Sequence, residues 1–136
     1  MVERPARVVL LVDDYESMRD AIARLLNAAG YECIAFVTAE SLLAHGPGVG
    51  AVCVLSDLKM PGMTGLELLI ELRRRGGYPP AILMTAHDAP GVREEAMRRG
   101  AAGYLAKPFQ ADQLMSAIED AIAANERDDR APQNDR

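Results

Sequence analysis

The fold of this chain is decided by one stretch of its sequence, Val52-Cys53-Val54-Leu55-Ser56-Asp57-Leu58-Lys59-Met60-Pro61-Gly62-Met63-Thr64-Gly65. An apolar run comes first and ends at a single carboxylate, Asp57. A loop containing proline and glycine follows, and then Thr64 and Glu67 have the spacing of a capping box at a helix start. An aspartate that closes a buried strand next to such a loop lies at the sheet edge where α/β folds place their chemistry.

Four other apolar segments have the length and composition of strands, and segments of helical periodicity separate them. The first, Val8-Val9-Leu10-Leu11-Val12, shows no polar alternation, which is typical of a parallel strand buried on both faces. The five expected strands span residues 7–12, 32–36, 49–56, 81–84 and 103–106. We therefore predict an α/β, flavodoxin-like (βα)5 doubly wound parallel sheet with strand order 2-1-3-4-5.

Each expected strand is followed by a helical pattern with one apolar face. Thr38 is a candidate cap for the second helix, and Asp88, followed by Pro90, is a candidate cap for the fourth. The predicted apolar positions are Leu66, Leu69, Ile70 and Leu72 in the third helix, Val92, Ala96 and Met97 in the fourth, and Leu114, Ile118, Ala121 and Ile122 in the fifth.

Length and charge limit the classes of protein to consider. The 136 residues suit one domain, which we place at residues 6–124, with 125–136 as a polar C-terminal tail or linker stub. The net charge is −5 and there is no broad basic stripe, which disfavours direct nucleic-acid binding by this domain. No apolar run could span a bilayer, and the N-terminus lacks the form of a signal peptide. We therefore expect a cytoplasmic protein with no membrane partner.

Two further features have plain structural explanations. Cys33 and Cys53 could form a disulfide, half of a metal site or reactive thiols, but we expect buried, reduced thiols that pack as small hydrophobes. The arginines at 73–75 and 98–99 close two expected helices, where cations complement the helix dipole.

Polar side chains follow four of the expected strands, and a parallel sheet brings these positions to one edge. The first strand ends at Asp13 and Asp14, the third at Asp57, the fourth at Thr85 and the fifth at Lys107. Three carboxylates in one crevice need a counter-charge, and Mg²⁺ prefers carboxylate and phosphate oxygens. Carboxylates, Mg²⁺, an ammonium and a hydroxyl together suit a phosphoryl group, which an aspartate can accept as a nucleophile.

These features resemble the receiver domain of response regulators in two-component signalling, over roughly residues 6–124. The resemblance rests on four segments at strand ends, namely Asp13-Asp14, residues 56–65, Thr85-Ala86 and Lys107-Pro108-Phe109. The residues from Met60 to Leu68 and the Lys107-Pro108-Phe109 segment are most similar to receivers of LuxR/FixJ-type transcriptional regulators, which a helix-turn-helix domain usually follows.

The resemblance implies a role for each acidic residue. Asp57 would accept a phosphoryl group from the phosphohistidine of a sensor histidine kinase. Asp14 would bind Mg²⁺ directly and Asp13 mainly through water, while Asp57 and the Lys59 backbone carbonyl would complete the protein ligands. The Lys59 side chain and His87 are further hypothesised to flank the phosphoryl group and tune its hydrolysis.

The resemblance also implies how the phosphoryl group is held and sensed. Thr85 and Lys107 would bind its oxygens, and the Lys107-Pro108 bond would be cis. Tyr104 would be the switch aromatic that turns inward as Thr85 moves toward the phosphate. A tyrosine on an edge strand is also often a plain packing residue, which is the alternative for Tyr104.

These roles predict a phosphorylation-dependent switch rather than an enzyme acting on an outside substrate. The domain would catalyse its own phosphorylation and dephosphorylation alone. Phosphorylation would shift the face formed by residues 92–123 and change homodimerisation or output, which we expect to be transcriptional. A stand-alone receiver that acts by protein–protein contact, without a DNA-binding domain, is the alternative.

Two other classes of protein compete with this interpretation. Phosphatases of the haloacid-dehalogenase kind usually carry Asp-x-Asp after the first strand and a cap domain, whereas Asp13 and Asp14 are adjacent. A flavodoxin-type cofactor binder needs a phosphate loop, but Asp13-Asp14-Tyr15-Glu16 would repel a phosphate without a metal. Taken alone, Asp14 could also be the N-cap of the first helix.

Overall fold

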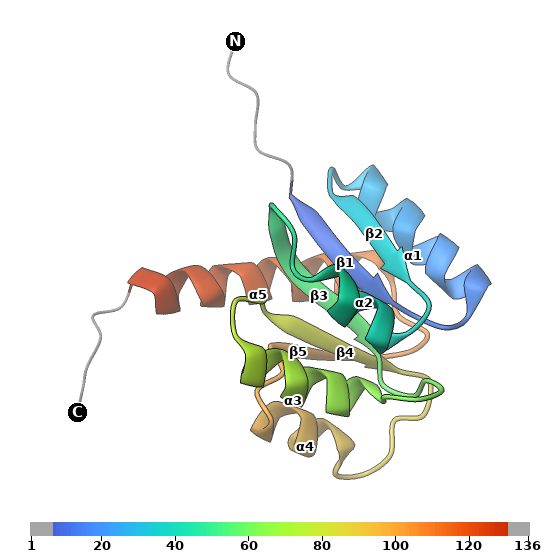
Figure 1. The fold of residues 1–136 in the computed structure, drawn as a ribbon. Coiled ribbons are helices and arrows are strands. Elements are labelled where there is room, and N and C mark those ends of the chain that lie inside the picture. Colours follow the sequence, from blue (N-terminus) through green and yellow to red (C-terminus); the bar gives the residue numbers. More distant parts are fainter. Residues whose placement is uncertain (1–6, 131–136) are drawn as a thin grey trace.

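Five parallel strands and five helices alternate along the chain (Figure 1). The computed structural model describes residues 7–130 and the side chains of residues 7–127. The elements are β1 (Val8–Val12), α1 (Glu16–Ala28), β2 (Glu32–Phe36), α2 (Ala39–His45), β3 (Ala51–Asp57), α3 (Gly65–Arg75), β4 (Ala81–Thr85), α4 (Val92–Arg98), β5 (Gly103–Ala106) and α5 (Ala111–Arg130). The strand order is β2-β1-β3-β4-β5, which confirms the predicted topology.

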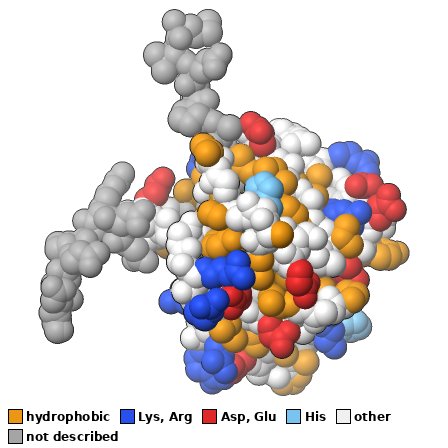
Figure 2. Space-filling model, in the orientation of Figure 1, with side chains coloured by type: hydrophobic (Ala, Val, Ile, Leu, Met, Phe, Trp, Pro, Cys, Tyr) orange, Lys and Arg blue, Asp and Glu red, His pale blue; other side chains and the backbone are white. Residues whose placement is uncertain are grey.

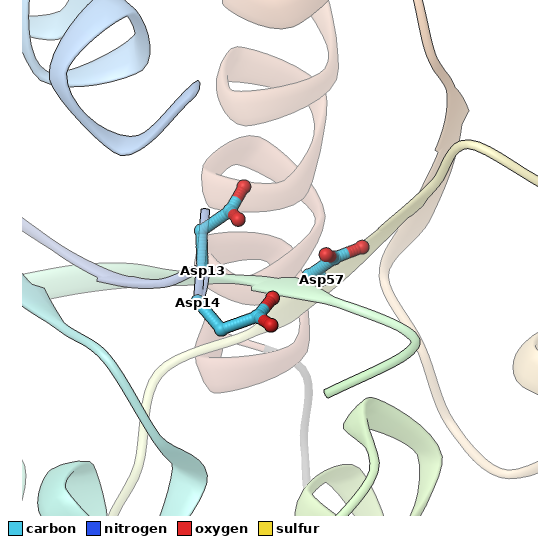
Figure 3. A group of neighbouring side chains, drawn as sticks. All are labelled: Asp13, Asp14 and Asp57. Atoms are coloured by element: carbon cyan, nitrogen blue, oxygen red, sulfur yellow. The ribbon is translucent and has the colours of Figure 1, made fainter. Parts of the chain in front are cut away.

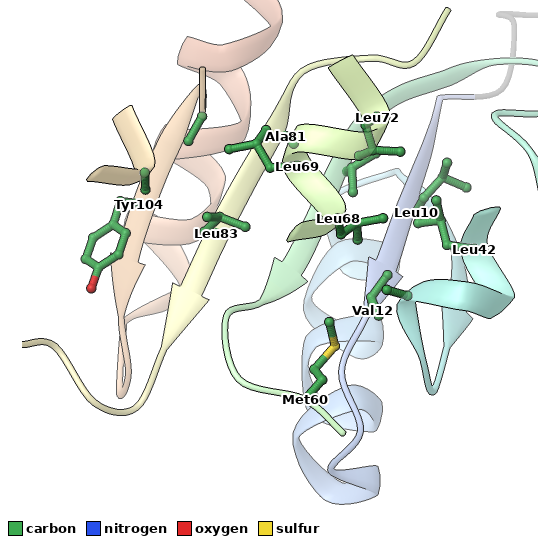
Figure 4. Close-up of a cluster of buried hydrophobic side chains, with 14 of the residues drawn as sticks. Leu10, Val12, Leu42, Met60, Leu68, Leu69, Leu72, Ala81, Leu83 and Tyr104 are labelled. Carbon is green, nitrogen blue, oxygen red and sulfur yellow. The ribbon is translucent and has the colours of Figure 1, made fainter. Parts of the chain in front are cut away.

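The sheet separates two hydrophobic cores because successive strand residues point to opposite faces. Leu10 and Val12 of β1 pack in a cluster with residues of α2, α3 and α4 (Figure 4). Val9 and Leu11 pack on the other face with residues of α1 and α5. β1 and β4 are buried along their whole length, as expected for central parallel strands.

Helix α3 begins as predicted, but its buried face differs from the predicted one. The Thr64 side chain accepts from the Glu67 amide at 3.1 Å and the Glu67 carboxylate accepts from the Thr64 amide at 2.9 Å, which completes the capping box. The prediction that Ile70 faces the core is wrong, because Ile70 is 42% exposed while Leu68 is 1% exposed. The buried positions are 65, 68, 69 and 72, which is the i, i+3, i+4, i+7 stripe of a helix lying on a sheet.

Helix α4 begins later than predicted. Its N-cap is Gly91, with φ 84°, and Asp88 lies in the exposed segment 86–91 that precedes it. The prediction that Asp88 is the N-cap is therefore wrong. Of the predicted apolar positions, Ala96 is buried but Met97 is 43% exposed, because this short helix turns a narrow stripe toward the sheet.

Helix α5 buries Leu114, Ile118, Ala121 and Ile122, as predicted. It continues to Arg130, so the expected end of the domain at residue 124 falls inside a helix. The remaining part of the expected tail, residues 131–136, lies outside the described residues.

The cysteines and the arginine clusters are accounted for by packing and local pairing. Cys53 is buried, Cys33 is partly exposed and both are free thiols, so the expectation of burial holds fully for Cys53 alone. Burial raises the thiol pKa to about 12 for Cys53 and about 11 for Cys33.

Basic side chains lie over the ends of α3 and α4 (Figure 2), where Glu71 pairs with Arg74 and Arg75 and Glu95 pairs with Arg98 and Arg99. Within residues 7–130 no helix is long and apolar enough to cross a membrane.

Candidate functional site

The predicted site residues lie together at the edge of the sheet where the strands end. Asp13 and Asp14 follow β1, Asp57 closes β3, Thr85 closes β4 and Lys107 follows β5. Figure 3 shows the three carboxylates gathered beside the ends of β1 and β3. The register explains this meeting, because Val12 pairs with Ser56, Asp57 with Met84 and Thr85 with Ala106.

The three carboxylates form a compact cluster with graded exposure. One carboxylate oxygen from each of Asp13, Asp14 and Asp57 lies within 4.8 Å of the others. Asp13 is fully buried, the Asp57 side chain is 14% exposed, and Asp14 is exposed. Charges at this separation repel one another strongly in a partly buried site, so the cluster requires cations.

Lys107 supplies one of these cations. Its ammonium Nζ lies 3.1 Å from Asp13 Oδ2 and 3.5 Å from Asp57 Oδ1, and its side chain is 9% exposed. The Lys107-Pro108 peptide bond is cis, as predicted. The Lys107 amide donates to the Thr85 carbonyl at 2.7 Å, which fixes the start of the loop after β5. A single ammonium therefore serves two of the three carboxylates.

Burial is the main influence on the acidity of Asp57. It raises the pKa of the Asp57 carboxyl above the ordinary value for aspartate; the Lys107 ammonium opposes this shift and the Asp13 carboxylate adds to it. A carboxylate with a raised pKa is a stronger base and a better nucleophile than an ordinary aspartate. Bound cations would favour the ionised form of this carboxyl and so oppose the shift.

Two hydrogen bonds hold Asp13, the first of the two aspartates that follow β1. The Asp13 Oδ1 atom accepts from the Tyr15 amide at 3.0 Å, and the Asp13 carbonyl accepts from the Arg19 guanidinium at 2.9 Å. The N-cap position of α1 is Tyr15, so the structure does not support Asp14 as the helix cap. Asp14 is thus left with an exposed carboxylate beside the other two.

Gly65 is a structural requirement of the site that the sequence analysis missed. A Cβ atom on Gly65 would lie 2.3 Å from the Asp57 carbonyl oxygen and 2.9 Å from the Leu58 Cα, so α3 can approach the acceptor aspartate through a glycine alone. The Gly65 amide donates to the Leu58 carbonyl at 2.8 Å, and the Leu58 amide donates to the Met84 carbonyl at 2.7 Å. The sequence contains a signal for this requirement, because Gly65 directly follows the helix cap Thr64 although its backbone does not have the positive φ that favours glycine.

An open cavity of about 590 Å³ borders the acceptor carboxylate. It is lined by Tyr15, Met18, Asp57, Lys59, Thr85, Ala86, His87, Lys107 and Pro108. Lys59 and His87 thus line the same cavity as Asp57, while their hypothesised role of flanking a phosphoryl group stays a prediction. The predicted ligand role of the Lys59 carbonyl remains a prediction.

Thr85 and Tyr104 occupy neighbouring parts of the site. Thr85 is 1% exposed, and its Oγ1 accepts from the His87 amide at 3.0 Å. Tyr104 is 7% exposed, and its hydroxyl donates to Asp88 Oδ1 at 2.9 Å. Burial first, and then the Asp88 carboxylate, raise the pKa of Tyr104 to about 12. The role of Asp88 as a partner of Tyr104 was not predicted, because its sequence context resembled a helix cap.

The donor set fits a hard divalent cation. Three carboxylates converge here, and within the described residues the Lys107 ammonium contacts two of them, Asp13 and Asp57. The exposed carboxylate of Asp14 is therefore available to a further cation. Oxygen donors of this kind suit Mg²⁺, which commonly binds through one or two carboxylates and keeps several waters.

Comparison with known proteins agrees with this geometry. Residues 9–119 match the family described as the response regulator receiver domain. The chain belongs to this family. It is a receiver domain of two-component response regulators, of the kind found in FixJ and NtrC. The fold and the acidic cluster agree with the match to the family.

Two similar curated proteins, one a transcriptional regulatory protein and the other a response regulator, are longer than this chain. The chain is 39% identical to the transcriptional regulatory protein FixJ of Bradyrhizobium diazoefficiens over 114 residues, which cover 84% of this chain and 56% of FixJ. It is 42% identical to the response regulator FleR of Pseudomonas aeruginosa over 113 residues, which cover 83% of this chain and 24% of FleR. The chain therefore spans about half or less of the length of these relatives.

Solved structures share the fold over most of the chain. The crystal structure of FixJ-N superposes with a TM-score of 0.80 at 34% identity and covers 88% of this chain and 96% of FixJ-N. The chemotaxis protein CheY4 of Vibrio cholerae gives a TM-score of 0.77 at 31% identity, covering 84% of this chain and 97% of CheY4.

Proposed function

We propose that Asp57 is the residue that accepts a phosphoryl group from the phosphohistidine of a sensor histidine kinase. The observation that carries the proposal is the ammonium of Lys107, which lies 3.5 Å from Asp57 and 3.1 Å from Asp13 and belongs to a residue that lines an open cavity. An Asp57 oxygen attacks phosphorus, the phosphorus–nitrogen bond to the imidazole breaks, and the imidazole leaves with a proton. The product is an acyl phosphate on Asp57.

The neighbouring side chains stabilise the charge that moves onto the phosphoryl oxygens. Lys107 provides an ammonium and Thr85 a hydroxyl donor at the edge of the same cavity. When bound, Mg²⁺ supplies charge neutralisation at the phosphoryl oxygens; Asp14, Asp57 and the Lys59 carbonyl would hold it directly and Asp13 through water. The Lys59 and His87 side chains border the cavity and would control the approach of water to the acyl phosphate. The domain acts on no outside substrate in this proposal.

The phosphoryl group would alter the face formed by α4, β5 and α5. It adds about −1.5 to −2 charges at neutral pH. Converting a 1:99 equilibrium into 99:1 requires about 5.5 kcal/mol, more than a single side-chain contact supplies. Coupling to homodimerisation through α4, β5 and α5 would provide the remainder. By analogy with the longer relatives, the output would be transcriptional; a stand-alone receiver acting by protein contact is the second possibility.

Phosphotransfer tests the acceptor directly. The protein is incubated with Mg²⁺ and either a phosphorylated candidate kinase or phosphoramidate, and phosphoprotein is separated on a phosphate-affinity gel and mapped by mass spectrometry. We expect phosphate on Asp57, none on the Asp57→Asn variant, and unchanged labelling of Asp112→Asn, which alters an exposed acid on α5. Equal labelling of wild type and Asp57→Asn would refute the proposal.

The proposed dimerisation is tested by measuring the molecular mass of the protein in solution. Light scattering after size exclusion, with and without beryllofluoride and Mg²⁺, should show a larger particle in the presence of the phosphoryl mimic. An unchanged monomer mass would exclude dimerisation and favour the stand-alone alternative.

A further inference from the structure

Arg19 lies at a position where the helix dipole does not explain a cation. It is near the start of α1 (Glu16–Ala28), and this helix has no basic residue in its last turn. The arginine clusters of α3 and α4 lie instead at the ends of their helices. A cation near a helix N-terminus is unfavourable because the dipole is positive there, so another contact must offset this cost.

That contact is a hydrogen bond to the backbone before the helix. The Arg19 guanidinium donates from Nη1 to the Asp13 carbonyl oxygen at 2.9 Å, and the Arg19 residue is partly buried. The Arg19 amide donates to the Tyr15 carbonyl at 2.9 Å, so the helix backbone fixes the base of the side chain. The first part of α1 is therefore tied to the residue that directly follows β1.

The Asp13 carbonyl belongs to the peptide group that joins Asp13 to Asp14. The rest of Asp13 is also held, because its amide donates to the Phe36 carbonyl at 3.1 Å. Its Oδ1 atom accepts from the Tyr15 amide at 3.0 Å, and its Oδ2 atom lies 3.1 Å from the Lys107 ammonium. Since a peptide group is planar, the direction of the Asp13 carbonyl sets the position of the Asp14 Cα atom.

Asp14 depends on this peptide more than the other two aspartates do. It is the exposed member of the acidic cluster and lies between β1 and α1, outside both elements. Figure 3 shows its carboxylate turned toward Asp57, and oxygens of the two residues lie within 4.8 Å of each other. The backbone that carries Asp14 therefore determines whether its carboxylate faces the cluster.

We propose that Arg19 is a positioning residue for the metal site, which holds the peptide between Asp13 and Asp14 so that the Asp14 carboxylate faces the cation. The inference rests on the proposed function, in which Asp14 binds Mg²⁺. Removal of the guanidinium should weaken Mg²⁺ binding roughly tenfold, the lower end of the loss typical when a group that orients a metal ligand is removed. A purely electrostatic role predicts the opposite direction, because a guanidinium repels Mg²⁺ and its removal would tighten binding.

Titration of the metal-free protein with Mg²⁺ at constant ionic strength, followed by ¹H–¹⁵N NMR, tests this inference. The variants are Arg19→Met and the matched control Arg24→Met, which makes the same chemical change at an exposed arginine of α1. We expect the dissociation constant to rise roughly tenfold in Arg19→Met and to change less than about twofold in Arg24→Met. The Asp14 amide resonance should shift in metal-free Arg19→Met but not in Arg24→Met, because this amide shares its peptide group with the Asp13 carbonyl.

Two further measurements separate positioning from folding and from the later chemistry. Arg19→Lys keeps the charge and one donor group, so it should bind Mg²⁺ with intermediate affinity; it replaces Arg19→Met if thermal unfolding shows that variant to be misfolded. Labelling of Asp57 by phosphoramidate should be slow in Arg19→Met at a Mg²⁺ concentration near the wild-type dissociation constant. Saturating Mg²⁺ should restore the rate, since the bound cation then holds Asp14 in place.

The outcomes also distinguish this inference from the proposed function. Unchanged or tighter Mg²⁺ binding in Arg19→Met would overturn the role of Arg19, because a contribution to the stability of α1 alone leaves the affinity of the folded protein unchanged. Slower phosphotransfer from a kinase with unchanged phosphoramidate labelling at limiting Mg²⁺ would also overturn it and assign Arg19 to kinase docking. Failure of wild type to bind Mg²⁺ or to become phosphorylated on Asp57 would instead overturn the proposed function, and the role of Arg19 with it.

Discussion

The aspartate cluster and the segment between β4 and α4 share one edge of the sheet, but they are held very differently. Asp13 accepts from the Tyr15 amide and pairs with Lys107, and Leu58, which follows Asp57, is held by hydrogen bonds to Met84 and Gly65. Residues 86–91 are all exposed and belong to neither a helix nor a strand. Within the described residues two side-chain hydrogen bonds reach that segment, from Tyr104 and to Thr85.

This difference separates two physical requirements. A group that accepts phosphate must be held close to its reactive geometry, because small displacements reduce the rate strongly. A segment that reports the event must be movable at low free-energy cost, and few buried contacts together with exposed backbone are the marks of such a segment. The first requirement is met around Asp57 and the second after Thr85.

The largest expected effect comes from removing the ammonium at the rigid cluster. Lys107→Met leaves the buried Asp13 carboxylate without its partner, so without divalent cations the free energy of unfolding should fall by about 3 kcal/mol. Phosphorylation of Asp57 by phosphoramidate should slow on the order of 100-fold. Urea denaturation and phosphate-affinity gels measure the two effects.

Lys59→Met is the matched control, since it removes an exposed lysine from the same cavity. Its stability should stay within about 0.5 kcal/mol of wild type. Equal stability of Lys107→Met and Lys59→Met would show that the Lys107 pair does not hold the cluster.

A smaller effect is expected where α3 meets the acceptor strand. Gly65→Ala places a Cβ atom against the Asp57 carbonyl and should cost about 2 kcal/mol of stability while slowing phosphorylation. Gly103→Ala is the comparison, because its Cβ would meet Ile82 at an ordinary 3.4 Å. Urea denaturation of both variants checks the prediction; similar losses in the two would contradict the close approach at Gly65.

The raised pKa of Asp57 predicts that replacing this residue by a neutral one stabilises the protein in a pH-dependent way. The gain in stability should be smaller than the loss expected in Gly65→Ala. In metal-free protein, burial makes the ionised carboxylate costly, so Asp57→Asn should be more stable than wild type at neutral pH. The gain should shrink as pH falls through the folded-state pKa, because wild type then becomes neutral as well. Denaturation at several pH values measures it, and a gain that grew at lower pH would contradict the direction of the shift.

The smallest effect is expected in the movable segment. Gly91 has φ 84°, so Gly91→Ala should cost at most about 1 kcal/mol, because the exposed segment can adjust around the new side chain. Thermal unfolding and phosphoramidate labelling measure stability and function, and labelling should be unchanged. A loss as large as that in Gly65→Ala would show that this segment is held as firmly as the cluster.

The topology and the meeting of Asp13, Asp57 and Lys107 were predictable from sequence. Buried parallel strands give uninterrupted apolar runs, and their ends must share one edge, so chemistry-bearing residues after each run are brought together by the topology alone. No measurement of packing was needed for that inference.

The missed features depend on contacts between segments distant in sequence. Asp88 resembles a helix cap until the structure shows its carboxylate at Tyr104. Gly65 looks dispensable until α3 is placed against the Asp57 carbonyl. Ile70 and Leu68 differ by two positions on a helix, and which of them is buried depends on how α3 lies on the sheet.

The partition of the interior by the sheet has an evolutionary consequence. Tyr104 belongs to the core that also contains residues of α2, α3 and α4, whereas the apolar residues of α1 and α5 pack on the opposite face. Substitutions can therefore accumulate in one core with little effect on the fit of the other. The output face draws on both cores, because α4 packs on the Tyr104 side and α5 on the opposite side, so changes in either core can alter what the switch controls.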